Sequence, residues 1–225
     1  MRPHISGLKF FFKIVSDFQL LSTRPVWKIG VDFEDQARNE GFRFVAGIDE
    51  VGRGCLAGPV VAAACILDPA KPLPKGLNDS KKLSASQREI TAGELKEIVL
   101  AYSIAQIEAE EIDEINILEA TKKAMFLAVT YLKPQADYLL IDALPLKQIP
   151  LPQKAIIKGD AISASIAAAS ILAKTYRDDL MHGFDSAYPQ YGFASHVGYG
   201  TKAHLAALKL HLACPLHRKT FRGVV

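Results

Sequence analysis

FVAGIDEVGRGCLAGPVVAAAC, residues 44–65, contains the clearest structural signal in this chain. An apolar run leads to two adjacent acids, Asp49 and Glu50, and a second apolar run follows a glycine-rich break. Short apolar runs bounded by glycine are typical of buried strands. The stretch therefore predicts two strands, with a pair of carboxylates at the end of the first.

The composition of the chain predicts one globular domain in a reducing compartment. The chain has 225 residues, 49% of them apolar, and a formal net charge of +3. Its three cysteines form no CxxC pair and no Cys/His cluster, which argues against a disulfide framework and against a structural zinc site. No apolar run approaches the ~20 residues of a membrane helix, and no signal-peptide cleavage site follows the apolar start. We expect a cytoplasmic protein that does not bind a membrane.

Strand-like and helix-like runs alternate along the rest of the chain. The patterns predict strands at 42–49, 58–67, 101–107, 137–144 and 154–160, and helices at 33–39, from Ser84 onward, and at 115–132 and 161–181. This order favours an α/β or α+β domain with a mixed sheet over residues 31–225, preceded by an N-terminal tail, residues 1–30, of uncertain order. The helix at 115–132 is expected to face the core with Ile117, Ala120, Ala124, Leu127, Ala128 and Tyr131.

Three of the predicted strands end in acids: Asp49 with Glu50, then Asp142, then Asp160. Taken singly, each acid could be a solvated loop residue or a helix cap, and Asp160 precedes a helical stretch that it could cap. If the acids converge at the rim of the sheet, two unit charges ~4 Å apart repel by about 4 kcal/mol at an effective dielectric constant near 20. A divalent cation would offset this repulsion, and all-oxygen ligation favours Mg²⁺ or Mn²⁺.

The adjacent pair raises a geometric difficulty. Neighbouring residues of a regular strand point to opposite faces, so Asp49 and Glu50 cannot both face one site from an unbroken strand. We therefore predict that the strand ends or bulges at the pair, because Gly52 and Gly54 follow and permit unusual backbone angles.

Several motifs, in order from about residue 33 to the end, resemble the bacterial type 2 ribonucleases H (ribonuclease HII). They are GIDEVGRGCLAGPVVAAA, NDSKKLS, LLID, IIKGD, AAASILAKTYRD, YPQYGFASHVGYGTKAH and LHRKTF. The resemblance implies an α/β ribonuclease H-like fold, with a mixed central β-sheet flanked by helices, and a Mg²⁺ or Mn²⁺ site. It also implies hydrolysis of RNA in RNA/DNA hybrids and cleavage 5′ of ribonucleotides embedded in duplex DNA, leaving 5′-phosphate and 3′-hydroxyl ends. The expected partners are these nucleic acids, and the expected state is a monomer.

The resemblance also implies roles for individual residues. The family's four acids, catalytic and metal-binding, correspond to Asp49, Glu50, Asp142 and Asp160. Its GRG tripeptide, whose backbone contacts the ribonucleotide 2′-hydroxyl, corresponds to Gly52, Arg53 and Gly54. Glycine suits that role because a backbone without side chains can approach the hydroxyl closely. Tyr199 corresponds to a tyrosine placed against the sugar at an RNA–DNA junction.

A second group of residues is expected near substrate phosphates. Asn78, Ser80 and Lys81 offer amide, hydroxyl and ammonium donors ahead of a predicted helix, and the alternative is an ordinary solvated turn and cap. Lys174, Arg177 and Arg218 either line the substrate face or form surface ion pairs. The histidines His196, His204 and His217 show no metal-ligand spacing and are expected to be structural or superficial.

The sequence departs from the family at two places and leaves two rival functions. Val197 stands where lysine is common, and Leu212 with Ala213 stand where a Gly-Pro pair is usual. A type 3 ribonuclease H usually lacks the GRG tripeptide, has glutamate as its fourth acid and carries an N-terminal substrate-binding domain. A non-catalytic nucleic-acid-binding module would have no use for an acidic cluster that repels phosphate. Both rivals are therefore disfavoured.

Overall fold

The computed structural model describes residues 28–224. Its strands are β1 (Val45–Val51), β2 (Val60–Leu67), β3 (Val99–Ile107), β4 (Tyr138–Asp142) and β5 (Gln153–Ile156). The α-helices are α1 (Asp32–Asn39), α2 (Ala85–Ile98), α3 (Ala109–Ile115), α4 (Ile117–Tyr131), α5 (Ala164–Ala187), α6 (Phe193–His196) and α7 (Lys202–His211). Three 3₁₀ turns are η1 (Ser80–Lys82), η2 (Gly159–Ala161) and η3 (Pro189–Tyr191).

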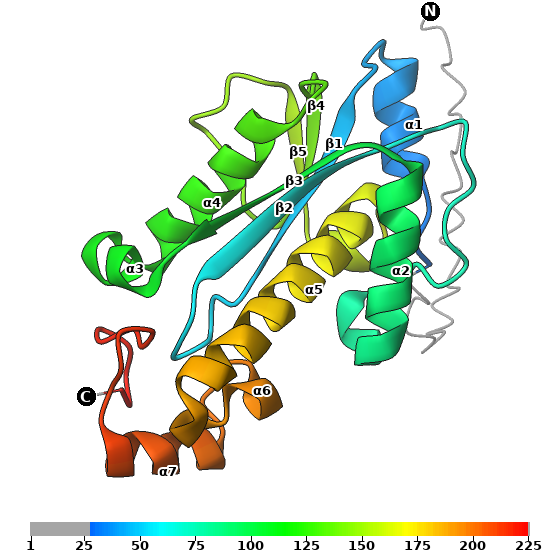
Figure 1. Ribbon diagram of the computed structural model, residues 1–225. Helices are drawn as coiled ribbons and strands as arrows, with labels where there is room; N and C mark the ends of the chain where they lie inside the picture. The colour runs from blue at the N-terminus through cyan, green and yellow to red at the C-terminus, as the bar shows by residue number, and fades with distance from the viewer. Residues whose placement is uncertain (1–27, 225) are drawn as a thin grey trace, which may run out of the picture.

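The strands form one mixed sheet in the order β3-β2-β1-β4-β5 (Figure 1). β1, β2 and β3 pair antiparallel, whereas β4 lies parallel to β1, and β5 lies parallel to β4. The parallel pairing of β1 with β4 needs a crossover connection, which α3 and α4 supply. The predicted mixed α/β sheet is confirmed.

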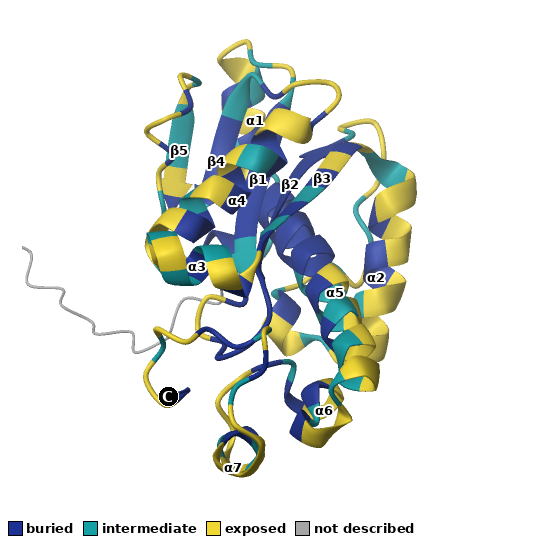
Figure 2. Cartoon of the chain, turned by 60° about the vertical axis from the view of Figure 1, so that its left-hand side comes forward, coloured by how far each residue is buried: buried dark blue, intermediate teal, exposed yellow. Residues whose placement is uncertain are grey.

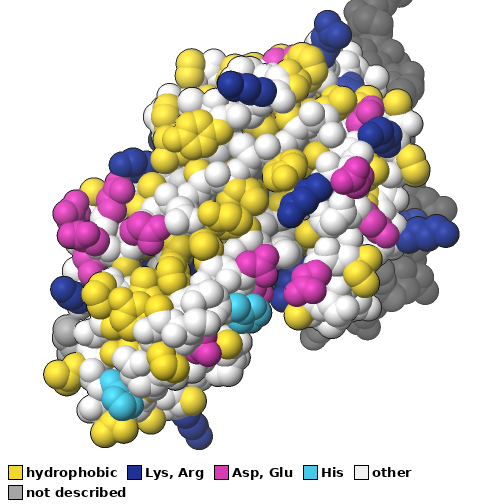
Figure 3. Space-filling model, in the orientation of Figure 1, with side chains coloured by type: hydrophobic (Ala, Val, Ile, Leu, Met, Phe, Trp, Pro, Cys, Tyr) yellow, Lys and Arg dark blue, Asp and Glu magenta, His cyan; other side chains and the backbone are white. Residues whose placement is uncertain are grey.

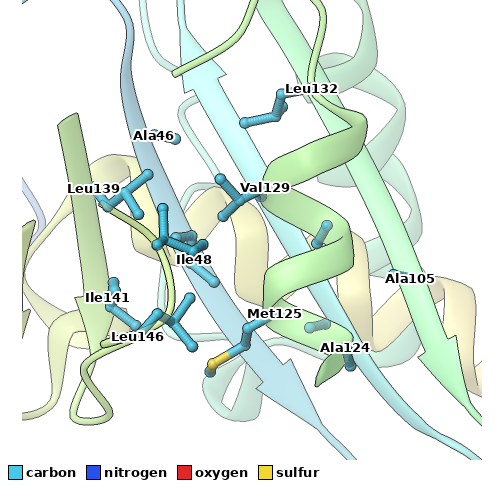
Figure 4. Close-up of a cluster of buried hydrophobic side chains, with 14 of the residues drawn as sticks. Ala46, Ile48, Ala105, Ala124, Met125, Val129, Leu132, Leu139, Ile141 and Leu146 are labelled. Atoms are coloured by element: carbon cyan, nitrogen blue, oxygen red, sulfur yellow. The ribbon is translucent and has the colours of Figure 1, made fainter. Parts of the chain in front are cut away.

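Helices cover both faces of the sheet, and the apolar residues of the strands alternate between them. On one face, α4 packs against β2, β3 and β1, and Met125, Val129 and the following Leu132 lie in the buried cluster there (Figure 4). On the other face, the N-terminal half of α5 is buried against β1 and β2 (Figure 2). The core therefore has two layers, one on each side of β1.

The buried face of α4 is rotated from the predicted one. Ala120, Ala124 and Ala128 are buried as expected, but Tyr131 is 56% exposed, and Met125 and Val129 take core positions. The prediction for Tyr131 is wrong because α4 has a second apolar stripe of the same period, which contains Met125 and Val129, and this second stripe is the one that is buried.

The predicted helix starts and stops are largely confirmed. Ser84 caps α2, and its side chain and that of Gln87 form a reciprocal capping box. Gly41 follows α1 with φ +101°, a conformation that glycine adopts without strain. The short helices α3, α6 and α7 were not predicted.

The N-terminal boundary is only partly visible. Residues 1–27 of the expected tail lie outside the described residues. Gly30 forms a parallel bridge with Ser163, and its carbonyl accepts a hydrogen bond from the Ala164 N–H at 2.8 Å. This segment therefore joins the start of α5.

Gly47 lets α5 lie unusually close to β1. A Cβ atom at Gly47 would stand 2.1 Å from the backbone carbon of Ser165. Real Cβ atoms do not approach backbone so closely, so a larger residue must push α5 away from the sheet.

We predict that Gly47→Ala lowers the free energy of unfolding by about 3 kcal/mol, because overpacking at backbone cannot relax by a rotamer change. Urea denaturation of both proteins measures it. Gly93→Ala is the control: Gly93 is an exposed position of α2 where an added methyl group would meet nothing within 4 Å, so alanine should stabilise the helix by about 0.5–1 kcal/mol. Equal stability of Gly47→Ala and the wild type would contradict the prediction.

Candidate active site

Asp49 and Asp142 lie side by side at the carboxyl ends of two parallel strands. The register of β1 and β4 pairs Ile48 with Ile141, so the next residue of each strand is an aspartate. Residues paired across a parallel ladder point to the same face of the sheet. The sheet thus brings together two acids that are 93 residues apart in sequence.

Asp160 joins them from the loop after β5. It lies in η2 and is 5% exposed, and the preceding Gly159 N–H donates to Asp142 Oδ1 at 2.8 Å. Ser163, rather than Asp160, caps α5, with its hydroxyl accepting from the Ile166 N–H. The capping role considered for Asp160 is therefore wrong, because the chain turns through η2 before the helix begins.

Glu50 reaches the same end of β1 from the opposite face. The ladder to β2 runs without interruption through Asp49 with Ala63, Glu50 with Ala62, and Val51 with Val61. The predicted strand break at the acid pair is wrong, because pairing with β2 holds the pleat regular to Val51. The carboxyl groups nevertheless come close to one another at the strand end, since, beyond the effect of burial, the charge of Glu50 raises the pKa of Asp49 and the charge of Asp142 raises that of Glu50. Gly52, with φ +90°, is the first residue at which the backbone departs from the strand.

Burial and like charge act together on the carboxyl groups. Desolvation raises the pKa of Asp49 well above its ordinary value, and the charges of Glu50 and Asp142 raise it further. Desolvation also raises the pKa of Glu50 and that of Asp142, with Asp160 contributing to the latter. Each ionised acid therefore makes ionisation of its neighbours less favourable.

Two basic side chains offset part of this repulsion. Lys81 Nζ lies 3.0 Å from Asp160 Oδ2, and Arg53 Nη1 lies 3.2 Å from Glu50 Oε1. Burial lowers the pKa of Lys81, but its hydrogen bond to Asp160 and the charge of that acid outweigh this, so the pKa lies above its ordinary value. The site thus carries both signs of charge, with the lysine on the exposed side.

The donor set suits a hard divalent cation. Partly or fully buried carboxylates that raise one another's pKa values are the arrangement that a bound cation stabilises, and all their donor atoms are oxygens. Over residues 28–224, no group of three or more acidic, histidine or cysteine side chains already has metal-binding geometry. The basic partners Lys81 and Arg53 hold two of the acids instead.

The GRG tripeptide forms a turn directly after β1. A Cβ at Gly52 would stand 2.2 Å from Arg177 Nε, whereas a Cβ at Gly54 would meet nothing within 4 Å. The two glycines therefore serve different purposes. Gly52 permits the positive φ and the packing beneath the turn, while Gly54 leaves open space above it.

Two buried arginines hold this turn from below. Arg177 and Arg218 are both 0% exposed, so the expectation that they line the substrate face or form surface ion pairs is wrong. Their guanidinium groups donate to backbone carbonyls: Arg177 to Ala57, Pro59 and Val197, and Arg218 to Arg53 and Gly58. No local sequence signal distinguishes such arginines from surface ones.

The remaining predicted residues surround the acids to different extents. Ser80 is buried, and its hydroxyl lies 2.9 Å from that of Ser170 in α5, whose side chain lowers the pKa of Asp49 against the larger effect of burial. Asn78 is exposed and accepts from the Asp79 N–H at 2.9 Å. Sequence reasoning missed Ser170, which lies in the alanine-rich first half of α5, where no local signal distinguishes it from Ser165.

Tyr199 lies in the loop between α6 and α7 and is 41% exposed. Its hydroxyl side adjoins Cys55, and Lys174 Nζ stands 5.9 Å from its ring centroid. The neighbouring Gly198 carbonyl accepts from the Leu56 N–H at 2.8 Å. This loop is therefore bound to the residues that directly follow the GRG turn.

Comparison with known proteins settles the family. The ribonuclease HII family model matches residues 46–224. The chain belongs to the ribonuclease HII family. The ribonuclease HII of Ruminiclostridium cellulolyticum is 55% identical over 191 residues, which cover 85% of this chain and 74% of that protein.

Solved structures agree on the fold. The ribonuclease H2 of Pyrococcus horikoshii superposes with a TM-score of 0.70 at 26% identity, covering 81% of this chain and 95% of that one. Bst-RNase HIII, solved in complex with Mn²⁺, superposes with a TM-score of 0.61 and covers 84% of this chain and 70% of its own. At 19% identity this second likeness shows the fold alone. The predicted ribonuclease H-like fold is confirmed.

Membership in the ribonuclease HII family establishes the reaction. The protein is a metal-dependent endonuclease that hydrolyses RNA in RNA/DNA hybrids and cleaves at ribonucleotides in duplex DNA. The resemblance to type 2 rather than type 3 enzymes is confirmed by the identity to ribonuclease HII. None of the helices in residues 28–224 is long and apolar enough to cross a membrane.

We predict that Asp49→Asn stabilises the ribonuclease HII fold at pH 7 in metal-free buffer. The folded-state pKa of Asp49 is raised, so stability falls as pH rises above the ordinary pKa of aspartate, where this carboxyl ionises more readily in the unfolded chain than in the folded protein. The asparagine variant avoids that loss, and its advantage should shrink toward about pH 4, the ordinary pKa of the unfolded aspartate. Urea denaturation with EDTA at both pH values measures it.

The exposed acid Asp179 of α5 provides the control. Asp179→Asn should change stability by less than about 0.5 kcal/mol, as expected of surface substitutions. A variant Asp49→Asn that is less stable than the wild type at pH 7 would contradict the electrostatic account.

Proposed function

We propose that Asp49, Glu50, Asp142 and Asp160 are the catalytic acids of this ribonuclease HII and hold Mg²⁺ or Mn²⁺. The observation that carries this assignment is the placement of Asp49 beside Asp142 at the ends of parallel strands, with pKa values raised by burial and neighbouring acids. Bound divalent ions would activate water and stabilise the leaving oxygen of the phosphodiester. The proposed cleavage lies 5′ of the ribonucleotide and leaves 5′-phosphate and 3′-hydroxyl ends.

The chain's own residues orient these acids. The Glu50 N–H donates to Asp49 Oδ1 and the Gly159 N–H donates to Asp142 Oδ1, each at 2.8 Å, so each carboxylate presents its other oxygen in a defined direction. Lys81 pairs with Asp160 and Arg53 pairs with Glu50, and these two positive charges offset part of the repulsion among the acids. Such orientation before substrate arrives lowers the reorganisation that the reaction requires.

We assign recognition of the ribose to the GRG turn, residues 52–54. The open space above Gly54 supports close approach of a sugar to the backbone, and Arg218 fixes the Arg53 carbonyl with a 3.0 Å hydrogen bond. The 2′-hydroxyl both donates and accepts, so a rigid backbone can test for its presence. Tyr199, half-exposed beside this turn, is proposed to contact the sugar at the RNA–DNA junction.

Asn78 and Lys81 are proposed to contact substrate phosphates from the exposed side of the site. The Lys81 side chain is 77% exposed, so its ammonium group can serve both Asp160 and a phosphate. The sequence predicts that Ser80 also contacts a phosphate. Its buried hydrogen bond to Ser170 supports a different role, the support of Asp49. The face around α3 is unsuited to phosphate, because its acidic side chains gather there (Figure 3).

We further propose that the enzyme acts as a cytoplasmic monomer. Its three cysteines are buried free thiols, which suits a reducing compartment. Sedimentation of the full chain tests the monomer, and fractionation of the source cells tests the compartment.

We predict that Mg²⁺ or Mn²⁺ supports a single nick 5′ of one ribonucleotide embedded in a DNA duplex. Asp49→Asn and Asp142→Asn should each lower the rate by at least about a hundredfold, because each removes a group that stabilises charge in the transition state. Denaturing electrophoresis of an end-labelled duplex measures the nick. Asp179→Asn should cleave like the wild type.

Calorimetric titration with Mn²⁺ separates lost chemistry from lost folding. The wild type should bind Mn²⁺ and gain about 2.7 kcal/mol of stability at a hundredfold excess over the dissociation constant. Asp142→Asn should fold normally and bind the ion far more weakly. Metal-dependent nicking by Asp142→Asn at the wild-type rate would refute the assignment of the acids.

We predict that replacing the lone ribonucleotide by its deoxy counterpart abolishes cleavage, since the GRG turn then has no 2′-hydroxyl to contact. Gly54→Ala tests the turn itself: nothing lies within 4 Å of the added methyl, so the melting temperature should not change, while kcat/KM should fall about tenfold. Equal cutting of the all-DNA duplex would show a general nuclease instead.

A further inference from the structure

Three buried histidines lie directly behind Tyr199. His196 ends α6, His204 lies in α7 and His217 lies near the C-terminus, with exposed fractions of 7%, 0% and 1%. The rings of His196 and His204 stack with centroids 4.4 Å apart. The expectation of structural or superficial histidines is met in its first part only, because none of the three reaches the surface.

The contacts of His217 determine which of its nitrogens carries the proton. The Cys214 N–H donates to His217 Nδ1 at 3.0 Å, and the Cys214 thiol lies 3.1 Å from the same atom. A nitrogen that accepts from a backbone N–H cannot itself carry a proton. In the neutral ring the proton is therefore on Nε2, which faces His204 Nε2 at 3.0 Å.

The position of the proton on His204 follows from that on His217. Its Nε2 accepts the proton of His217, so its own proton is on Nδ1, which donates to the Tyr199 carbonyl at 2.9 Å. Burial lowers the pKa of His204, and burial together with His204 lowers that of His217 to about 4. Both rings are therefore neutral near pH 7, and the chain of donors runs in one direction, from Cys214 to Tyr199.

His196 completes the support of the same loop. The Gly198 N–H donates to its Nδ1 at 3.3 Å, which leaves Nε2 to donate to the Tyr191 carbonyl at 2.9 Å. All six ring nitrogens of the three histidines thus have partners. A merely space-filling role would not require each ring to have one particular tautomer.

This series of hydrogen bonds ends at the backbone of Tyr199. The Tyr199 carbonyl accepts from His204 and from the Thr201 N–H at 2.8 Å, and the Tyr199 N–H donates to the His196 carbonyl at 2.9 Å. These bonds fix the peptide groups on both sides of the Tyr199 Cα atom, from which the half-exposed ring extends.

We propose that His204 and His217 are positioning residues for substrate recognition, which hold the Tyr199 carbonyl through the directed chain Cys214–His217–His204–Tyr199. The inference rests on the recognition role proposed for Tyr199. It adds that the C-terminal segment, through His217, helps to set the preference of the enzyme for RNA–DNA junctions.

NMR of the wild-type protein tests the directions of these hydrogen bonds. Long-range ¹H–¹⁵N spectra distinguish the two neutral tautomers of each histidine. We expect protonated Nε2 in His217 and His196, and protonated Nδ1 in His204. Protonated Nε2 in His204, or a charged ring at pH 7, would overturn the proposal, and this measurement needs no variant to fold.

Two substitutions of His204 separate its two hydrogen bonds. His204→Asn keeps a side-chain N–H near the position of Nδ1 and can still donate to the Tyr199 carbonyl. His204→Gln keeps an amide near the position of Nε2, so it retains the contact with His217 and loses the bond to Tyr199. The readout is the ratio of kcat/KM on a single-ribonucleotide duplex to kcat/KM on a continuous RNA/DNA hybrid, with melting temperatures measured alongside.

We expect His204→Gln to lower this ratio about tenfold, the size of one lost hydrogen bond, and His204→Asn to keep it within about twofold. An equal loss in both variants would mean a general packing effect and would overturn the proposal.

Tyr199→Ala separates this inference from the function on which it rests. A lower ratio for Tyr199→Ala with an unchanged ratio for His204→Gln refutes the positioning role alone. An unchanged ratio for Tyr199→Ala refutes the recognition role of the tyrosine, and with it the reason for positioning it.

Discussion

The close contact between α5 and β1 is the constraint on which the site depends. Gly47 and the alanines of the helix allow the backbones to approach, because neither surface carries a large side chain between them. The same helix then delivers Ser170 to Asp49 and Arg177 to the carbonyls under the GRG turn. A shift of α5 would therefore move an acid's partner and the base of the recognition turn together.

The buried acids near this contact lower the stability of the folded protein. Buried carboxylates with raised pKa values oppose folding at neutral pH, and the basic partners Lys81 and Arg53 offset only part of that repulsion. Away from the acids, buried polar groups have partners of a different kind: the guanidinium groups of Arg177 and Arg218 donate to backbone carbonyls, and His204 and His217 are neutral and hydrogen-bonded to each other. Elsewhere, Glu34 is a buried acid that receives hydrogen bonds from Ser163 and Ser165 on one carboxylate oxygen.

Much of this arrangement followed from local sequence patterns. The strands, α2 with its Ser84 cap and the long α5 were predicted because periodicity and capping are properties of neighbouring residues. The prediction failed where two alternatives had the same local signal. Tyr131 and Met125 both fit a helical stripe, and only contact with the sheet selected Met125. The bulge expected at Glu50 also failed, because pairing with β2 lies outside the local sequence.

The sequence alone therefore determined which acids end the strands, where the glycine turn follows them and which family the motifs resemble, since each is a property of residues close together in the chain. Only the tertiary structure decided that β1 continues unbroken through Glu50, that Arg177 and Arg218 are buried, and that His217 is linked to Tyr199 through His204. The reason is physical. A hydrogen bond such as that of Arg218 to Gly58 joins residues 160 positions apart, and no local pattern records which distant carbonyl a donor will meet.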